Sequence, residues 1–255
     1  MEYLSYRAND KVGMITINND KQRNALSLPV IREFKSLLHQ IGKDREVHVL
    51  VIAADGKIFS SGHNLREIDG TPAEAIAGLF DECQQFMQLL RDIPQVTIAK
   101  VHSMATAAGC QLVAACDLAV ASEQATFATP GVHIGLFCST PAVFISRNVG
   151  RKKAAEMLFT GDSITAQEAL VAGLVNHVVP HEQLDSAAEE LARRIARHAL
   201  STLEIGKREF YKQLNMEDFE ALSYASQVIS LNALHSDAKE GIRAFIEKRP
   251  AKWRV

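Results

Sequence analysis

The sequence contains two stretches of small residues that each follow a β-branched run: Phe59-Ser60-Ser61-Gly62-His63-Asn64-Leu65 and Ala105-Thr106-Ala107-Ala108-Gly109-Cys110-Gln111. The runs before them, His48–Ala53 and Val96–Val101, are typical of buried strands. Small residues after a strand let a ligand approach the backbone closely, and free N–H groups at a helix start favour negative charge. Because the second stretch opens an apolar run with helical character, we expect the two stretches to hold a developing oxyanion between two backbone donors.

Outward from these stretches, the pattern divides the chain into two parts. A hairpin of Tyr3–Arg7 and Val12–Asn18 is predicted near the start, and short strands are predicted at Asp117–Ser122 and Ala125–Ala128. From Thr140 onward the strand signal nearly vanishes, so we predict an α/β core over residues 1–195 and a helical region over residues 196–255. The expected helices include one that starts after Ser27, then Ala73–Ile93, Lys153–Phe159, Ala166–Ala172, Leu184–His198, Leu203–Gln213, Phe219–Ala233 and Ala238–Glu247.

Composition excludes several classes of partner. With 255 residues, 47% of them hydrophobic, the chain can bury a sizeable core, and a net charge of −2 gives no reason to expect nucleic acid or an anionic membrane as a partner. No apolar run approaches the length of a membrane span, and no secretory signal is visible. Four cysteines without a CxxC pair are interpreted as reduced thiols, and we expect neither a metal nor a separate cofactor. The expected location is cytoplasmic, or the mitochondrial matrix if the chain is eukaryotic and processed.

Motifs along nearly the whole chain resemble the crotonase, or enoyl-CoA hydratase/isomerase, superfamily. They include Arg23-Asn24-Ala25-Leu26, the Phe59–Leu65 loop, Gly109–Leu112 with Cys116-Asp117, and Phe127–Gly131. The matches continue through Leu158–Gly161, Ala166–Ala169, Ala172–Val175 and Glu240–Phe245.

The resemblance implies a crotonase-like (ClpP/crotonase) spiral of β-β-α units and a C-terminal helical trimerisation region, with homotrimers that often pair into hexamers. It also implies an acyl-CoA thioester ligand, so coenzyme A would arrive as part of the substrate. By motif position, the thioester oxygen would accept hydrogen bonds from the backbone N–H groups of His63 and Ala108. The family usually has glycine where Ala108 stands.

The same resemblance assigns the remainder of the binding site. The loops that contain Arg23, Ala25 and Leu26, and Ser61, Asn64 and Leu65, would wrap the coenzyme A. Phe245 and Lys248 match C-terminal positions that often reach the coenzyme A of a neighbouring subunit.

The sequence departs from the family where proton transfer is expected. Two glutamates of the standard hydratases would stand at Gln111 and Gly131, and an aspartate used by some isomerases and dehalogenases would stand at Ser139. Adding water requires two carboxylates with different proton affinities. Gln111 can orient a water but cannot take a proton, and Gly131 offers only backbone. The standard hydration mechanism therefore lacks its acid and base.

Several other residues are candidate substitutes for the missing carboxylates. The His63 side chain, His133, and the acidic Glu67, Asp81 and Glu82 could act on the acyl group. Against these stand plainer interpretations: His133 as a structural histidine, Cys138 as a small packing residue, and Asp117 as the tie of a turn. Gln111 is expected to line the pocket.

The sequence thus predicts an acyl-CoA-binding protein of the enoyl-CoA hydratase/isomerase type, a lyase with weak or non-standard activity in fatty acid metabolism. One alternative is a methylmalonyl-CoA decarboxylase-like enzyme, whose enolate needs no base, although the tyrosine of that branch falls near Cys138. The other is a non-catalytic acyl-CoA-binding or regulatory protein.

Overall fold

Two sheets form the centre of the molecule, and the computed structural model describes residues 1–253 of the chain. The main sheet has the strand order β1-β2-β3-β4-β6-β9, in which β1 and β2 are antiparallel and the other neighbours are parallel. The second sheet has the order β5-β7-β8. The strands are β1 (Leu4–Asn9), β2 (Val12–Ile17), β3 (Val49–Ala54), β4 (Val96–Val101), β5 (Ala105–Thr106), β6 (Leu118–Ser122), β7 (Thr126–Ala128), β8 (Ile164–Thr165) and β9 (His177–Val179).

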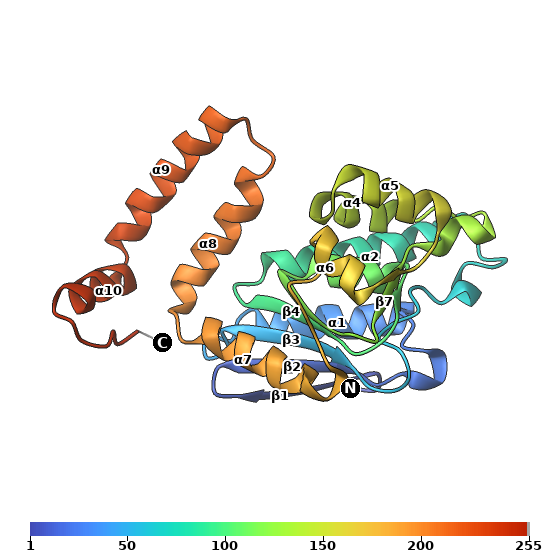
Figure 1. Ribbon diagram of the computed structural model, residues 1–255, viewed down its shortest axis with the longest axis horizontal. Helices are drawn as coiled ribbons and strands as arrows, with labels where there is room; N and C mark the ends of the chain where they lie inside the picture. Colours follow the sequence, from blue (N-terminus) through green and yellow to red (C-terminus); the bar gives the residue numbers. More distant parts are fainter. Residues whose placement is uncertain (254–255) are drawn as a thin grey trace.

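Helices cover both faces of the main sheet, and Figure 1 shows their arrangement. They are α1 (Leu28–Ile41), α2 (Ala73–Asp92), α3 (Ala108–Ala115), α4 (Ser139–Asn148), α5 (Arg151–Thr160), α6 (Ala166–Ala172), α7 (Leu184–Ala196), α8 (Leu200–Gln213), α9 (Asp218–Leu234) and α10 (Ser236–Ile246). Short 3₁₀ turns lie at Asp20–Gln22, Leu65–Glu67, Pro130–Ile134 and His181–Gln183.

Strand β3 shows how the chain builds two cores. Its side chains alternate between faces: Leu50 and Ile52 belong to a large core with α1, α2 and α3, while Val49 and Val51 pack against α7. Because both faces are covered, every residue of β3 is buried and the strand has no polar alternation. The carboxyl ends of the parallel strands β3 and β4 therefore lie side by side and carry the two small-residue stretches to one edge.

Four elements differ from the sequence-based prediction. Strand β5 lies within the second small-residue stretch, which was expected to be a loop. Strands β8 and β9 lie in the part where the strand signal vanishes, and β9 adds the sixth strand to the main sheet. With two and three residues, respectively, they are too short to show a period of two. Helix α4 was also missed. It contains Pro141 in its first turn, where a missing N–H costs no intrahelical hydrogen bond.

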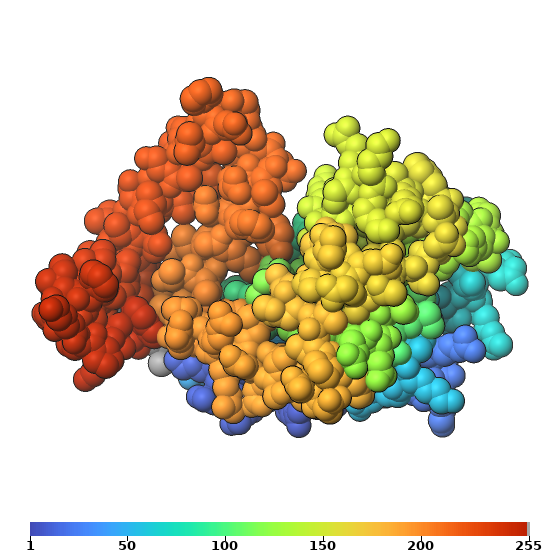
Figure 2. Space-filling view, in the orientation of Figure 1, coloured from blue at the N-terminus to red at the C-terminus, as the bar shows by residue number. Residues whose placement is uncertain are grey.

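The last helices extend from the core, and Figures 1 and 2 show α9 and α10 away from the sheet. Helix α8 is attached through Lys207, whose buried Nζ lies 2.8 Å from Asp117 Oδ2 and donates to the carbonyls of Leu90 (2.6 Å) and Gln95 (2.8 Å). Tyr211 Oη donates to Asp117 Oδ1 at 2.7 Å. Asp117 therefore joins α8 to the core, beyond its predicted role in a turn. The boundary between residues 195 and 196 stays a prediction.

Helix α9 has no buried residue, and its large apolar side chains face several directions. Among the described residues, no helix is both long and apolar enough to cross a membrane. The exposed side chains of α9 and α10 are Phe219, Leu222, Ile229, Leu231, Leu234, Ile242, Phe245 and Ile246.

Candidate functional site

Asn24 sets the position of the loop that begins the site. It is fully buried with φ +50°, a conformation that asparagine tolerates better than most residues. Its Nδ2 donates to the carbonyls of Asp55 (2.7 Å) and Ile58 (2.8 Å), and its Oδ1 accepts from the N–H of Asn19 (2.9 Å). Ser60 Oγ in turn donates to the Asn24 carbonyl at 2.8 Å. The loop at residues 23–26 is thereby fixed to the start of the Phe59–Leu65 stretch.

The two small-residue stretches are joined through their backbones. The N–H groups of Phe59 and Ser60 donate to the Met104 carbonyl (3.0 and 3.2 Å), and the Thr106 N–H donates to the Ser60 carbonyl (3.0 Å). Gly109 lies against this junction, because a Cβ added there would stand 2.6 Å from the Ser60 carbonyl oxygen. Only glycine allows α3 to approach this closely, so the predicted convergence of the two stretches is confirmed.

The junction leaves two backbone donors without a protein acceptor. Within residues 1–253, no hydrogen bond uses the N–H of His63 or of Ala108. They are neighbours: a Cβ added to Gly62, directly before His63, would lie 3.0 Å from the Ala108 nitrogen. Ala108 is the first residue of α3, with its N–H at the positive end of the helix dipole. This is the geometry expected of a site for an oxygen that carries negative charge.

Ala107 is the residue at this corner whose backbone conformation is strained. Ala107 has φ +50° and ψ −119°, a region that favours glycine, whereas Ala108 lies within the helix. The Ala107 N–H donates to the Ala128 carbonyl (2.9 Å), and the Ala107 carbonyl accepts from the Gln111 N–H (3.0 Å). The strain therefore lies one residue before the position considered from the sequence, and Ala108 keeps an ordinary donor.

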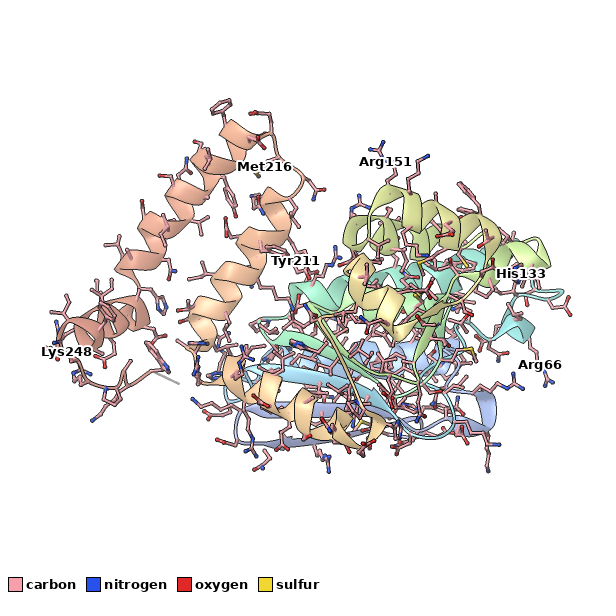
Figure 3. The ribbon with its side chains drawn as sticks, viewed as in Figure 1. Arg66, His133, Arg151, Tyr211, Met216 and Lys248 are labelled. Carbon is pink, nitrogen blue, oxygen red and sulfur yellow. The ribbon has the colours of Figure 1, made fainter. Side chains whose placement is uncertain are left out.

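A cavity of about 1020 Å³ opens beside the two donors. No aspartate or glutamate is among the described residues that line it, whereas Lys21, Arg23 and Arg66 are. Figure 3 shows Arg66 and His133, another lining residue, at the same end of the molecule. The predicted site residues on its wall are Arg23, Ala25, Ser61, His63, Asn64, Leu65, Ala108, Gly131 and Ser139.

Four predicted site residues are not on this wall. Leu26 is fully buried beneath it and contributes its carbonyl to the His63 side chain. Gln111 is 1% exposed and lies behind the wall, which corrects the expectation that it lines the pocket. Phe245 is exposed on α10, and Lys248 lies at the opposite end of the molecule from His133 (Figure 3). A single chain therefore does not bring Phe245 or Lys248 to the cavity.

Gln111 is connected to the cavity through Thr140, a lining residue that the sequence analysis missed. Thr140 Oγ1 donates to Gln111 Oε1 at 3.1 Å, across 29 positions of sequence. The neighbouring motif position Ser139 could have suggested Thr140, which follows it in the first turn of α4.

Gly131, the second position where a glutamate is missing, is enclosed by its own turn. The Leu136 N–H donates to the Gly131 carbonyl at 2.9 Å, closing the loop after the 3₁₀ turn Pro130–Ile134. A Cβ at Gly131 would stand 1.9 Å from the Leu136 carbonyl oxygen and 2.9 Å from Cys138 Sγ. The turn therefore excludes any side chain at this position.

The His63 side chain is held as a neutral imidazole. A carbonyl can only accept, so the 3.2 Å contact between His63 Nδ1 and the Leu26 carbonyl places the proton on Nδ1. Nε2 is buried without a partner among residues 1–253, and the ring meets Phe80 edge-on with centroids 5.2 Å apart. Burial lowers the pKa of His63, with the Leu26 hydrogen bond acting in the opposite direction.

Three of the other candidate groups, His133, Glu67 and Glu82, have structural partners. His133 Nε2 donates to the Thr160 carbonyl at 2.7 Å, which confirms its structural role. Glu67 accepts from the Leu28 N–H at 3.0 Å, and Glu82 pairs with Arg32 and Lys35. Burial raises the pKa of the Cys138 thiol, which suits packing better than nucleophilic attack.

Stability should fall as the pH drops below about 6.5, because burial lowers the pKa of His48, His63 and His102 in the folded protein. The unfolded chain then binds protons that the folded chain does not, and each such histidine contributes at most about 1.4 kcal/mol per pH unit. Urea unfolding between pH 7.5 and 5.5 measures the slope. His63→Gln should make it shallower, whereas exposed His39→Gln should not, and equal slopes for all three proteins would contradict the assignment.

Comparisons with known proteins follow this geometry. The family model described as enoyl-CoA hydratase/isomerase matches residues 7–255. The chain belongs to the enoyl-CoA hydratase/isomerase family. Its predicted crotonase-like fold is confirmed as well, because a crystal structure of enoyl-CoA hydratase from Mycobacterium smegmatis matches it with a TM-score of 0.96 and 40% identity over 99% of both chains.

Within the enoyl-CoA hydratase/isomerase family, the chain resembles a mitochondrial animal protein. It is 47% identical over 251 residues to enoyl-CoA hydratase domain-containing protein 3, mitochondrial, from Rattus norvegicus, over 98% of this chain and 83% of that one. The crystal structure of human enoyl-CoA hydratase domain-containing protein 3 matches with a TM-score of 0.96 and 43% identity, covering 98% of this chain and 100% of that chain.

Proposed function

We propose that the protein binds an acyl thioester of coenzyme A and places its carbonyl oxygen between the N–H groups of His63 and Ala108. The observation that carries this proposal is the pair of adjacent, unpaired backbone donors at the edge of a large cavity. Fixed donors of this kind stabilise an enolate oxygen, and removing one from an enzyme typically costs about 10²–10³ in rate. Lys21, Arg23 and Arg66 add positive charge along the same wall.

Hydration of an enoyl thioester by this site is proposed to be weak or absent. A general base must come within about 3 Å of its proton, directly or through one water, and no carboxylate is among the described lining residues. Gln111 and the turn at Gly131 supply neither acid nor base. The proposal is therefore an enoyl-CoA hydratase/isomerase-like binding site with non-standard chemistry, and a binder without catalysis is its favoured alternative.

Gly62→Ala tests the donor pair. The methyl group would lie 2.8 Å from Ala107 Cβ and 3.0 Å from the Ala108 nitrogen, so it should narrow the space between the donors. We expect affinity for butyryl-CoA, measured by calorimetry, to fall about tenfold, the upper range for one neutral hydrogen bond. Gly70→Ala is the matched control, because Gly70 also has positive φ but nothing within 4 Å.

The assay also separates the alternatives. Circular dichroism of both variants checks that Gly62→Ala stays folded. Equal affinity of folded Gly62→Ala and wild type would refute the assigned donor pair, and absence of acyl-CoA binding by wild type would refute the whole proposal. Turnover of crotonyl-CoA would show catalysis, and release of CO₂ from methylmalonyl-CoA would favour a decarboxylase.

The proposal includes an assembly of identical chains, a homotrimer or hexamer, in the cytoplasm or the mitochondrial matrix. Contact with a neighbouring chain would bury the exposed apolar side chains of α9 and α10. Phe245 and Lys248 could reach the cavity only from such a neighbouring chain. The word mitochondrial in the name of the similar rat protein supports the matrix if the chain is eukaryotic.

A further inference from the structure

Thr140 presents a hydrogen-bond acceptor to the cavity. A threonine hydroxyl has one proton, and that of Thr140 is donated to Gln111 Oε1 at 3.1 Å. Gln111 is buried behind the wall, so this hydrogen bond points away from the cavity. The lone pairs of Thr140 Oγ1 remain for a group inside it.

The side chain of His63 has the same polarity. Its Nδ1–H is used by the Leu26 carbonyl, so the unpartnered Nε2 is an acceptor as well. The donors of this region are the backbone N–H groups of His63 and Ala108, which the thioester oxygen would occupy. Near these two donors, Thr106 has a hydroxyl free to act either way among the described residues. Because His63 Nε2 is itself buried, Thr140 is the member of this pair that a ligand in the cavity can meet, and it fits a ligand group that donates.

We propose that Thr140 is a specificity-determining residue, which accepts a hydrogen bond from a hydroxyl group held beside the thioester. The hydroxyl belongs either to the acyl chain itself or to a water retained with the ligand. This inference rests on the proposed acyl-CoA site and adds to it the kind of acyl group that fits. A ligand carboxylate is disfavoured, because its oxygens would meet a lone pair and not a donor at Thr140.

The test compares butyryl-CoA with 2-hydroxybutyryl-CoA and 3-hydroxybutyryl-CoA by calorimetry on the full chain. Thr140→Val removes the hydroxyl at similar volume, Thr140→Ser keeps it, and Thr71→Val, at a threonine outside the described lining residues, is the control. If the acyl chain supplies the hydroxyl, Thr140→Val should lower affinity for one hydroxybutyryl-CoA by about tenfold and leave butyryl-CoA unchanged. Thr140→Ser should keep most of the wild-type preference.

Other outcomes distinguish the source or reject the inference. If a retained water supplies the hydroxyl, Thr140→Val should lower the affinity for butyryl-CoA and for both hydroxylated ligands by the same factor, with Thr71→Val unaffected. Unchanged affinities for all three ligands in Thr140→Val would overturn the inference while leaving the acyl-CoA site intact. A wild-type protein that binds none of the three would overturn the inference and the proposed function together.

Freeing the Thr140 proton gives an independent check. Gln111→Leu removes the acceptor behind the wall, so the Thr140 hydroxyl becomes able to donate into the cavity. The preference of the Gln111→Leu variant for the hydroxylated ligand over butyryl-CoA should then be smaller than that of wild type. The Gln111→Glu variant, in which residue 111 still accepts from Thr140, should retain the wild-type preference. The opposite order of the two variants would contradict the assigned direction of this hydrogen bond.

Discussion

Gly131→Glu will destabilise the protein and will not create hydratase activity, although the family resemblance places a glutamate of the standard hydratases at this position. The new Cβ would stand 1.9 Å from the Leu136 carbonyl oxygen, a backbone atom that cannot turn aside. The loop must open and lose the hydrogen bond from the Leu136 N–H to the Gly131 carbonyl. Overpacking of this kind costs about 3 kcal/mol, and urea unfolding measures it.

Gly135→Ala provides the matched control in the same loop. Gly135 has φ +72° with nothing within 4 Å of an added Cβ, so only the conformational cost of about 1 kcal/mol applies. Loss of crotonyl-CoA absorbance should remain negligible in Gly131→Glu and in the double variant with Gln111→Glu. Efficient hydration by a double variant of wild-type stability would show that the closed turn is not what prevents a carboxylate here.

Lys207→Met should destabilise the protein by about 3–5 kcal/mol, because it leaves the Asp117 carboxylate, whose side chain is only 12% exposed, without its cation. It also removes the donor to the carbonyls of Leu90 and Gln95. Urea unfolding measures the loss, and hydrogen exchange should show α8 exchanging faster.

A double-mutant cycle isolates the ion pair. Adding Asp117→Asn to Lys207→Met removes the unpaired charge and should recover part of the lost stability. Exposed Lys152→Met should change the free energy of unfolding by less than about 0.5 kcal/mol. If Lys207→Met behaves like Lys152→Met, the buried pair does not hold α8 on the core.

Much of the fold was predictable because long apolar periods are local. The helix Ala73–Asp92 and the strand Val96–Val101 match their predicted ranges to within one residue. Strand β9 was not predictable in the same way, since His177–Val179 acquires its identity only by pairing with β6.

The site was predictable where a motif fixed the backbone and not where side chains meet across the sequence. The convergence of the two small-residue stretches was predicted from their places after buried strands, and the family resemblance placed the two donors at His63 and Ala108. The hydrogen bond between Thr140 and Gln111 joins residues 29 positions apart, and the closure at Gly131 depends on a carbonyl five residues ahead. Neither leaves a periodic or compositional signal.

The left-handed backbone of Ala107 has a consequence for the timing of binding. A residue in this conformation costs about 1–3 kcal/mol, and surrounding hydrogen bonds to Ala128 and Gln111 hold it there without any ligand. The free-energy cost of this conformation therefore arises once, when the chain folds. In the proposed function, each arriving thioester would meet donors that are already in position, so little conformational entropy would be lost on binding.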